Sequence, residues 1–151
     1  SWENLFGFVC SERHATYRNA VRTGEFTVSY PTPDQVVATS LTAAPRSPDD
    51  SKPSLVVVQT EPAKAVDGAL ISGARIHFEC ELERTVEDLG SNSLVIGRIV
   101  AAAVTEAAVR FLDREDWHTI TEAPILVYLP PNRYATIDES RSFPFPAGWS
   151  R

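Results

Sequence analysis

The chain of 151 residues has no methionine and only two cysteines, Cys10 and Cys80. Both cysteines stand within apolar, strand-like runs, which favours buried free thiols over a disulfide or a redox pair. No apolar run approaches the roughly 20 residues of a membrane-spanning helix, and no signal peptide is visible at the start. We therefore expect a cytoplasmic protein without a membrane partner.

Basic residues are also in short supply, because 14 Lys and Arg stand against 20 Asp and Glu, for a formal net charge of −6. A nucleic-acid backbone selects a basic protein face, so this balance argues against a nucleic-acid partner. The hydrophobic share of 43% supplies a core for one globular domain. We assign that domain to residues 1–151, with a C-terminal tail at 138–151.

Several catalytic signatures are missing. There is no G-x-S-x-G pattern of a nucleophile hydrolase, and Cys10 lies in an apolar strand rather than in an activating electropositive pocket. No G-x-G-x-x-G or P-loop appears, which argues against a Rossmann dehydrogenase and an NTPase. His77, Glu79 and Glu81 alternate at a spacing that a metal could use. A polar surface row explains the same spacing, and we expect no metal.

What the chain does have is apolar alternation at the period of a β-strand, with a few short helical patterns between. The predicted strands are 5–10, 25–30, 55–59, 69–72, 74–87, 93–104, 124–129 and 134–137. The predicted helices are 16–22 and 34–44, with a helical turn at 106–112, an exposed loop at 45–53 and charged connecting chain at 113–122. Strands dominate, which predicts a mainly β fold, a closed or partly closed antiparallel barrel with short flanking helices.

The same patterns predict which side chains face the core. In the strand at 74–87, the face that begins at Ile76 is expected inside, and the face that begins at His77 is expected to be polar. The inward residues of the two helices are expected to be Tyr17, Ala20, Val21, Val36, Val37 and Leu41. The proline-rich tail at 142–149 cannot form an ordinary strand or helix. Its aromatic residues need a surface, such as a neighbouring subunit.

The most informative stretch is GFVCSERHATYRNAVRTGEFTVSY, residues 7–30. An apolar strand runs into a polar loop at the start of a helix, where unpaired N–H groups and the positive end of the helix dipole favour a phosphate. The candidate phosphate-binding residues are Ser11, Arg13, His14 and Thr16. His14, Arg18 and Arg22 recur every four residues, which indicates a solvated helix face more than an extension of the anion site.

GFVCSERHATYRN followed by TGEFTVSYP resembles the flavin reductase-like proteins, whose fold is the FMN-binding split barrel. The resemblance continues through SLTAAP at 40–45, IHFECELERTVE at 76–87, SLVIGRIVAAAV at 93–104 and APILVYLPPNRYATI at 123–137. It implies a homodimer that binds FMN, with FAD as the alternative flavin, and reduces the flavin with NADH or NADPH. Such proteins often pass reduced flavin to a partner monooxygenase.

The resemblance also implies roles for particular residues. Arg13, His14 and Thr16 match the family's phosphate-binding loop, and Ser11 begins it. Ala15 stands where many members have Asp, so we expect a weaker helix cap here. No catalytic side chain is assigned, because hydride passes between nicotinamide and flavin while the protein supplies position and electrostatics.

Two departures from the family keep an alternative open. The family's ring-contacting segment would precede Ser1, so we expect an N-terminal part of the domain to lie outside this chain. The region 128–134 has no counterpart of the His that some members place near the nicotinamide or flavin. The alternative is an FMN-binding electron carrier, or a flavin-binding protein, without nicotinamide activity of its own.

Overall fold

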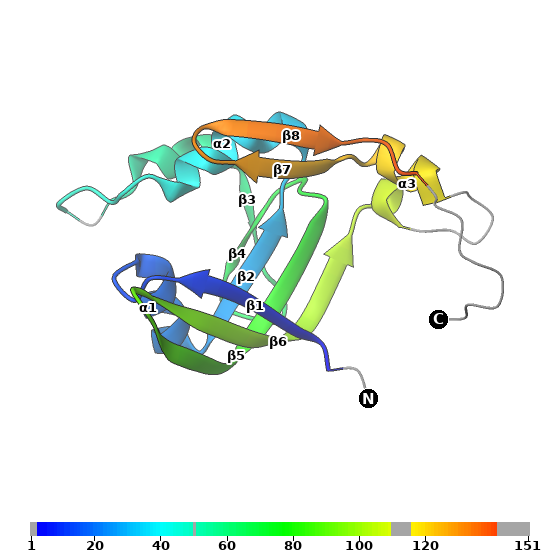
Figure 1. Ribbon diagram of the computed structural model, residues 1–151. Coiled ribbons are helices and arrows are strands. Elements are labelled where there is room, and N and C mark those ends of the chain that lie inside the picture. Colours follow the sequence, from blue (N-terminus) through cyan, green and yellow to red (C-terminus); the bar gives the residue numbers. More distant parts are fainter. Residues whose placement is uncertain (1–2, 50, 110–115, 142–151) are drawn as a thin grey trace.

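The computed structural model describes residues 3–49, 51–109 and 116–141 (Figure 1). The strands are β1 (Leu5–Cys10), β2 (Glu25–Tyr30), β3 (Thr60–Pro62), β4 (Ala69–Ile71), β5 (Ile76–Leu89), β6 (Asn92–Val104), β7 (Ile125–Leu129) and β8 (Arg133–Ile137). The helices are α1 (Ala15–Thr23), α2 (Val36–Ser40) and α3 (Asp116–Glu122), with 3₁₀ turns at Pro33–Gln35, Leu41–Ala43, Pro53–Val57 and Glu106–Ala108.

A rolled four-stranded antiparallel sheet, in the order β1-β6-β5-β2, forms the centre of the molecule. The β5–β6 hairpin carries register shifts, one of them between Glu79 and Cys80, and such bulges bend a strand and increase its twist. The Phe8 and Phe26 rings, on the two edge strands β1 and β2, stand 5.3 Å apart. Because two other strands separate those edges, the contact requires the sheet to roll into a partial barrel.

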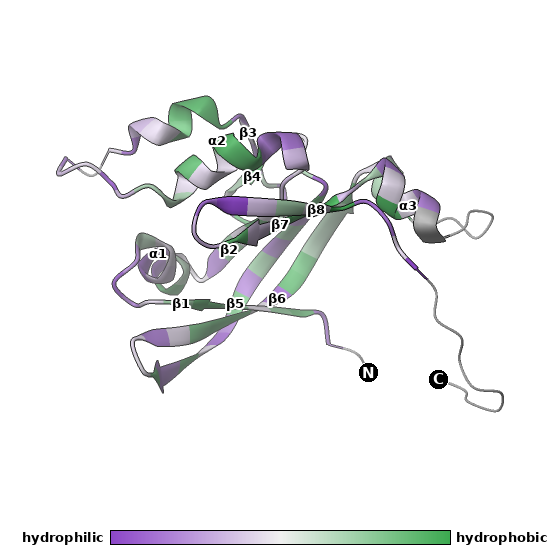
Figure 2. Ribbon diagram, turned by 45° about the horizontal axis from the view of Figure 1, so that its top comes forward, coloured by the Kyte–Doolittle hydropathy of each residue, from purple (hydrophilic) through white to green (hydrophobic). Residues whose placement is uncertain are grey.

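Aromatic side chains fill the inside of the roll. Phe6 on β1 stands 6.4 Å from Phe26 on β2 and 5.9 Å from Phe78 on β5. Val95 and Cys80 are fully buried. Figure 2 shows hydrophilic and hydrophobic bands along β5 and β6, in keeping with the predicted alternation. The predicted strand at 74–87 is thus confirmed to within two residues as β5.

The expectation of a polar surface row on β5 is wrong for His77 and Glu79, which are 8% and 6% exposed. The segment around β3 and β4 covers this face. The Glu79 carboxylate accepts hydrogen bonds from the backbone N–H groups of Lys64 at 2.9 Å, Val66 at 3.2 Å and the intervening Ala65. Polar side chains therefore face inward here because they satisfy the backbone of the covering loop.

The predicted strand at 55–59 is wrong, because Pro53–Val57 forms a 3₁₀ turn. Pro53 stands at its start, where the fixed φ of proline favours helical geometry. The predicted helix at 34–44 is broken into a 3₁₀ turn, the short helix α2 and another 3₁₀ turn. The inward placement expected for Val21, Val37 and Leu41 is also wrong, since all three are exposed.

The C-terminal half differs from the sequence prediction in one element. Asp116–Glu122 forms helix α3 where we expected charged connecting chain, while the turn expected from residue 106 is present as Glu106–Ala108. The predicted tail at 142–149 lies outside the described residues. Among the residues that the structure describes, no helix is long and apolar enough to cross a membrane.

Candidate cofactor site

The loop between β1 and α1 is shaped by Ser11. The backbone N–H of His14 donates to the Ser11 carbonyl oxygen at 2.9 Å, and the N–H of Arg13 donates to the Ser11 Oγ at 3.4 Å. Helix α1 follows with His14 as its N-cap residue in extended conformation. Ser11 therefore positions the loop through both of its oxygens.

The N-terminus of α1 leaves donors available for an anion. His14 makes no side-chain capping bond, and the first turn contains no acidic residue. The N–H of Arg18 donates to the His14 carbonyl, which leaves the N–H groups of the three preceding residues without an acceptor inside the helix. Ala15 is the first residue of the helix and His14 is its cap, so the weaker cap expected from Ala15 stays a prediction. These N–H groups and the helix dipole favour a bound anion.

A cavity of about 540 Å³ opens between this end of α1 and the segment from Thr42 to Leu55. It is lined by Arg13, His14, Ala15, Thr16, Arg18, Asn19, Thr42, Ala43, Ala44, Pro45, Arg46, Lys52 and Leu55. Among the described residues, the lining contains four Lys or Arg side chains and no Asp or Glu, although acidic residues outnumber basic ones in the chain. Such a lining favours a polyanionic ligand.

The structure brings three of the four predicted site residues together. Arg13, His14 and Thr16 line the large cavity. Ser11 lines a separate, smaller cavity of about 290 Å³, which it shares with Arg13. Arg13 thus lines both cavities, whereas Ser11 lines only the smaller one.

Sequence reasoning missed the second wall of the cavity. Arg46 and Lys52 lie in the proline-rich segment that the sequence indicated only as an exposed loop. That segment also carries Asp49 and Asp50 in its sequence, so its formal net charge is zero and gave no signal. Arg18, which the sequence indicated as part of a solvated helix face, lines the cavity as well.

Two of these cations are fixed by backbone carbonyls. The Arg18 guanidinium donates to the Arg13 carbonyl oxygen, and the Lys52 ammonium donates to the Thr42 carbonyl oxygen. Within the described part of the chain, no carboxylate forms an ion pair with either side chain. Both cations therefore keep their charge and further donors for a ligand.

The two cysteines are free. Cys80 is fully buried, and burial raises the pKa of its thiol to about 11. Cys10 is half-buried, and its Sγ lies 3.8 Å from the Nδ1 of His14 beside the cavity. The expectation of a buried free thiol is therefore confirmed for Cys80 and only partly for Cys10.

His77 and Glu79 have partners that explain their burial without a metal. The His77 Nδ1 lies 3.1 Å from the Ser29 Oγ, which also accepts a hydrogen bond from the N–H of Ile71. No group of three potential metal ligands occurs within residues 3–49, 51–109 and 116–141. Glu79 directly, and His77 through Ser29, thus attach the covering loop, while Glu81 is exposed.

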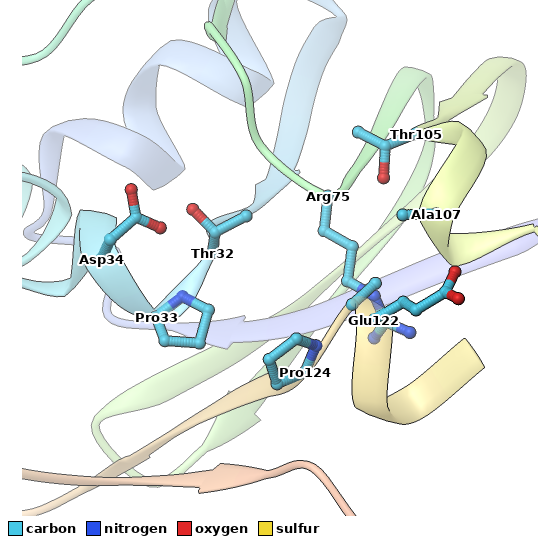
Figure 3. Close-up of a pocket in the computed structure, with 9 residues that line it drawn as sticks. Thr32, Pro33, Asp34, Arg75, Thr105, Ala107, Glu122 and Pro124 are labelled. Carbon is cyan, nitrogen blue, oxygen red and sulfur yellow. The ribbon is translucent and has the colours of Figure 1, made fainter. Parts of the chain in front are cut away.

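A third cavity, of about 400 Å³, lies where α3 and β7 approach the start of β5 (Figure 3). Figure 3 shows Arg75 extending between Thr32 on one side and Ala107 on the other. The Arg75 Nε is buried and has no hydrogen-bond partner among the described residues. Asp34 and Glu122 also line this cavity, so its charge is mixed and it does not select an anion as the first cavity does.

Comparisons with known proteins agree with the fold. The flavin reductase like domain model matches residues 1–131. The uncharacterized protein YwrF of Bacillus subtilis (strain 168) is 32% identical over 130 residues, which span 82% of this chain and 62% of that protein. The chain therefore belongs to the flavin reductase like family.

Solved structures share the architecture. The 2-nitrobenzoate 2-nitroreductase NbaA of Pseudomonas fluorescens aligns with a TM-score of 0.77 at 18% identity, over 97% of this chain and 72% of that chain. Nitrilotriacetate monooxygenase component B of Bacillus cereus aligns with a TM-score of 0.74 at 26% identity, over 92% and 71%. The fold is the mainly β, FMN-binding split barrel, and the family is one of flavin-related oxidoreductases.

Proposed function

We propose that this protein binds the phosphate of FMN at the start of α1 and acts as an NAD(P)H-dependent flavin reductase. The observation that supports this proposal is the cation-rich cavity, which joins unpaired helix N–H groups to the side chains of Arg13, His14 and Thr16. It occurs in a chain of the flavin reductase like family, at the place where the family motif predicts a phosphate.

The residues present fit a flavin phosphate. A phosphomonoester carries about −1.5 to −2 charges at pH 7 and has three strong acceptor oxygens. The Arg13 guanidinium offers charge and N–H donors, the Thr16 hydroxyl offers one donor, and the helix terminus offers backbone N–H groups. Ser11 supports these groups by fixing the loop from which Arg13 and His14 extend.

In this reaction the role of the protein's own side chains is to position the flavin. A bound flavin would supply the ring that accepts hydride from a nicotinamide. The side chains around the cavity would fix the phosphate end and thereby orient the remainder of the molecule. An acid–base pair is not needed for this role.

A homodimer and a partner monooxygenase belong to the same proposal. Tyr128 and Tyr134 face each other across the β7–β8 hairpin and are 55% and 54% exposed. Exposed apolar surface of this kind supports a second copy as its cover. The likeness to a monooxygenase component B supports a role in supplying reduced flavin, in the cytoplasm, to an oxygenase.

An FMN-binding electron carrier is the second candidate. The turn between β7 and β8 contains Pro130, Pro131 and Asn132, and it has no histidine that could approach a nicotinamide. Flavin binding would then persist without hydride transfer from NADH or NADPH.

The two candidates separate in one anaerobic titration. The purified protein, loaded with FMN, is mixed with NADH or NADPH while the visible absorbance of the flavin is followed. The reductase proposal predicts bleaching with at least one nucleotide. Persistent colour with both nucleotides supports the carrier, and failure to take up FMN at all contradicts both candidates.

A further inference from the structure

The cavity of about 400 Å³ that Arg75 lines, hereafter the Arg75 cavity, lies at the opposite end of the β5–β6 hairpin from the start of α1 (Figure 1). Cys10, the last residue of the strand that leads into α1, pairs with Ser93 beside the turn of the hairpin. Arg75 instead comes just before the pair of Ile76 and Val104, where the hairpin is open. Among the described residues, none lines both the Arg75 cavity and the cavity beside α1. The two cavities are therefore separate places on the molecule.

The backbone of Arg75 is fixed, and its side chain has a donor to spare. Its N–H donates to the carbonyl oxygen of Tyr30 at 2.8 Å, and its carbonyl oxygen accepts from the N–H of Thr105 at 3.0 Å. The Nε is buried without a hydrogen-bond partner. In the part of the chain that the structure describes, no carboxylate forms an ion pair with the guanidinium. Because buried polar groups in folded proteins are almost always hydrogen-bonded, this N–H points to an acceptor that a ligand brings.

A carboxylate is the acceptor that suits this donor. The Nε–H and a neighbouring N–H of the guanidinium form a planar fork that matches the two oxygens of a carboxylate. Thr32 and Thr105 also line the cavity, and their hydroxyl groups can donate to the same ligand. Much of the remaining lining is apolar and consists of Pro33, Ala107, Ala123 and Pro124. The lining around Arg75 therefore favours a carboxylate on a short apolar chain.

The rim of the Arg75 cavity carries the opposite charge. Asp34 and Glu122 line it as exposed residues, whereas the Nε of Arg75 is buried. Figure 3 shows Asp34 apart from Arg75, on the far side of Thr32 and Pro33. Carboxylates at the mouth of a cavity repel a simple anion and attract a cation. A ligand with a carboxylate at one end and an ammonium group at the other suits both parts of the lining.

We propose that the Arg75 cavity binds a small amino acid, whose carboxylate meets the Arg75 guanidinium and whose ammonium group lies beside Asp34. This ligand is neither a flavin nor a nicotinamide nucleotide, and its site does not depend on a phosphate at the start of α1. The assignment gives a reason for the unpaired Nε, because proteins retain such unsatisfied groups at functional sites.

The first test compares ligands on the full wild-type chain by calorimetric titration. The probes are 3-aminopropanoate, 4-aminobutanoate and 6-aminohexanoate, which differ in the separation of their two charges, and we expect saturable binding of at least one. The matched carboxylate, such as butanoate for 4-aminobutanoate, is expected to bind about two- to fivefold more weakly, as for loss of one exposed ion pair. The matched amine, such as butylamine, is expected to bind at least about tenfold more weakly, because it lacks the group that Arg75 recognises.

The second test uses variants whose folding is checked by circular dichroism. Arg75→Met is expected to lower the affinity for the amino acid at least about tenfold, while the exposed Arg84→Met, outside the lining, binds as wild type does. Asp34→Asn is expected to make the amino acid and its matched carboxylate bind equally, with the exposed Asp67→Asn as its control. The affinity for FMN is expected to stay unchanged in all four variants, because none of these positions lines the cavity beside α1.

Three results would overturn this assignment. Absence of binding by all three amino acids would leave the buried Nε to water alone. Equal affinities of Arg75→Met and wild type would place the ligand elsewhere, and equal affinities of wild type for the amino acid and its matched carboxylate would exclude a role for Asp34. A fall of FMN affinity in Arg75→Met would contradict the separation of the two cavities. A wild-type protein that binds the amino acid and never binds FMN would instead refute the proposed function and support the Arg75 site.

Discussion

The ring of Phe26 on β2 lies against the backbone of Gly97 on β6, so closely that a Cβ at position 97 would stand 2.5 Å from two ring carbons. The same Cβ would meet the carbonyl oxygen of Glu81 at 3.0 Å. Strand β5 lies between β2 and β6 in the sheet, so the contact is made across the inside of the roll. The aromatic core can therefore pack this closely only because Gly97 has no side chain.

We expect Gly97→Ala to destabilise the protein by about 1–3 kcal/mol, because the added methyl group forces the Phe26 ring to move. Urea unfolding followed by circular dichroism measures the change. Gly7→Ala is the matched control, since a Cβ at Gly7 would meet its neighbours at 3.5 Å or more, an ordinary contact. Equal stabilities of the two variants would show that the roll is looser than described.

Glu79 attaches the covering loop to the sheet. Its carboxylate accepts backbone N–H bonds from Lys64, Ala65 and Val66, and the residue is 6% exposed. We expect Glu79→Gln to cost about 1.5–3 kcal/mol of unfolding free energy, because hydrogen bonds to a charged group are replaced by weaker ones. Glu81→Gln, on the same strand and exposed, should leave stability within about 0.5 kcal/mol of wild type. A loss of similar size in both variants would contradict this role.

The buried Cys80 thiol gives the protein a pH-dependent stability. Burial raises its pKa from 9.0 to about 11, so the unfolded chain loses this proton at lower pH than the folded chain does. The contribution of Cys80 to stability is therefore fully present below pH 9 and is lost as the pH rises towards 11. Melting temperatures of wild type and Cys80→Ala, compared at pH 8 and pH 10.5, should show wild type losing more. A constant difference would mean that the thiol is solvated.

Arg75 places a donor where the described residues offer no acceptor. Its Nε is buried and has no partner among those residues, beside the cavity of about 400 Å³. Replacing such a group by an apolar one of similar shape is close to neutral or stabilising. We expect Arg75→Met to unfold within about 1 kcal/mol of wild type or to be more stable, as judged by urea titration beside the exposed Arg84→Met. A selective loss of more than about 2 kcal/mol in Arg75→Met would show that Nε has a partner in the folded protein.

Local sequence patterns predicted most of the strands of the fold. Alternation in 74–87 and 93–104 predicted the two strands of the β5–β6 hairpin, to within two residues at each end. Patterns failed where a tertiary contact decided the outcome. His77 and Glu79 alternate as surface residues do, and only the covering loop makes them interior.

Only one wall of the candidate site could be predicted from the sequence. Arg13, His14 and Thr16 follow one another at a helix start, so a local motif could bring them together. Arg46 and Lys52 reach the same cavity because a segment distant in the sequence folds against α1. Periodicity in the sequence does not predict such a contact. The sequence of that segment contains Asp49 and Asp50 as well, so the formal charges cancel and charge counting could not find the two cations.

The central claim is that the start of α1 holds the phosphate of a flavin, and comparison of FMN with riboflavin tests it most directly. Riboflavin has the same ring and lacks the phosphate. Dissociation constants are measured for both ligands with wild type and with Arg13→Ala/His14→Ala. The account predicts that wild type prefers FMN, and that the double variant loses at least about tenfold in FMN affinity while its riboflavin affinity is retained. Unchanged FMN affinity in the variant, or an equal fall for both ligands, would contradict it.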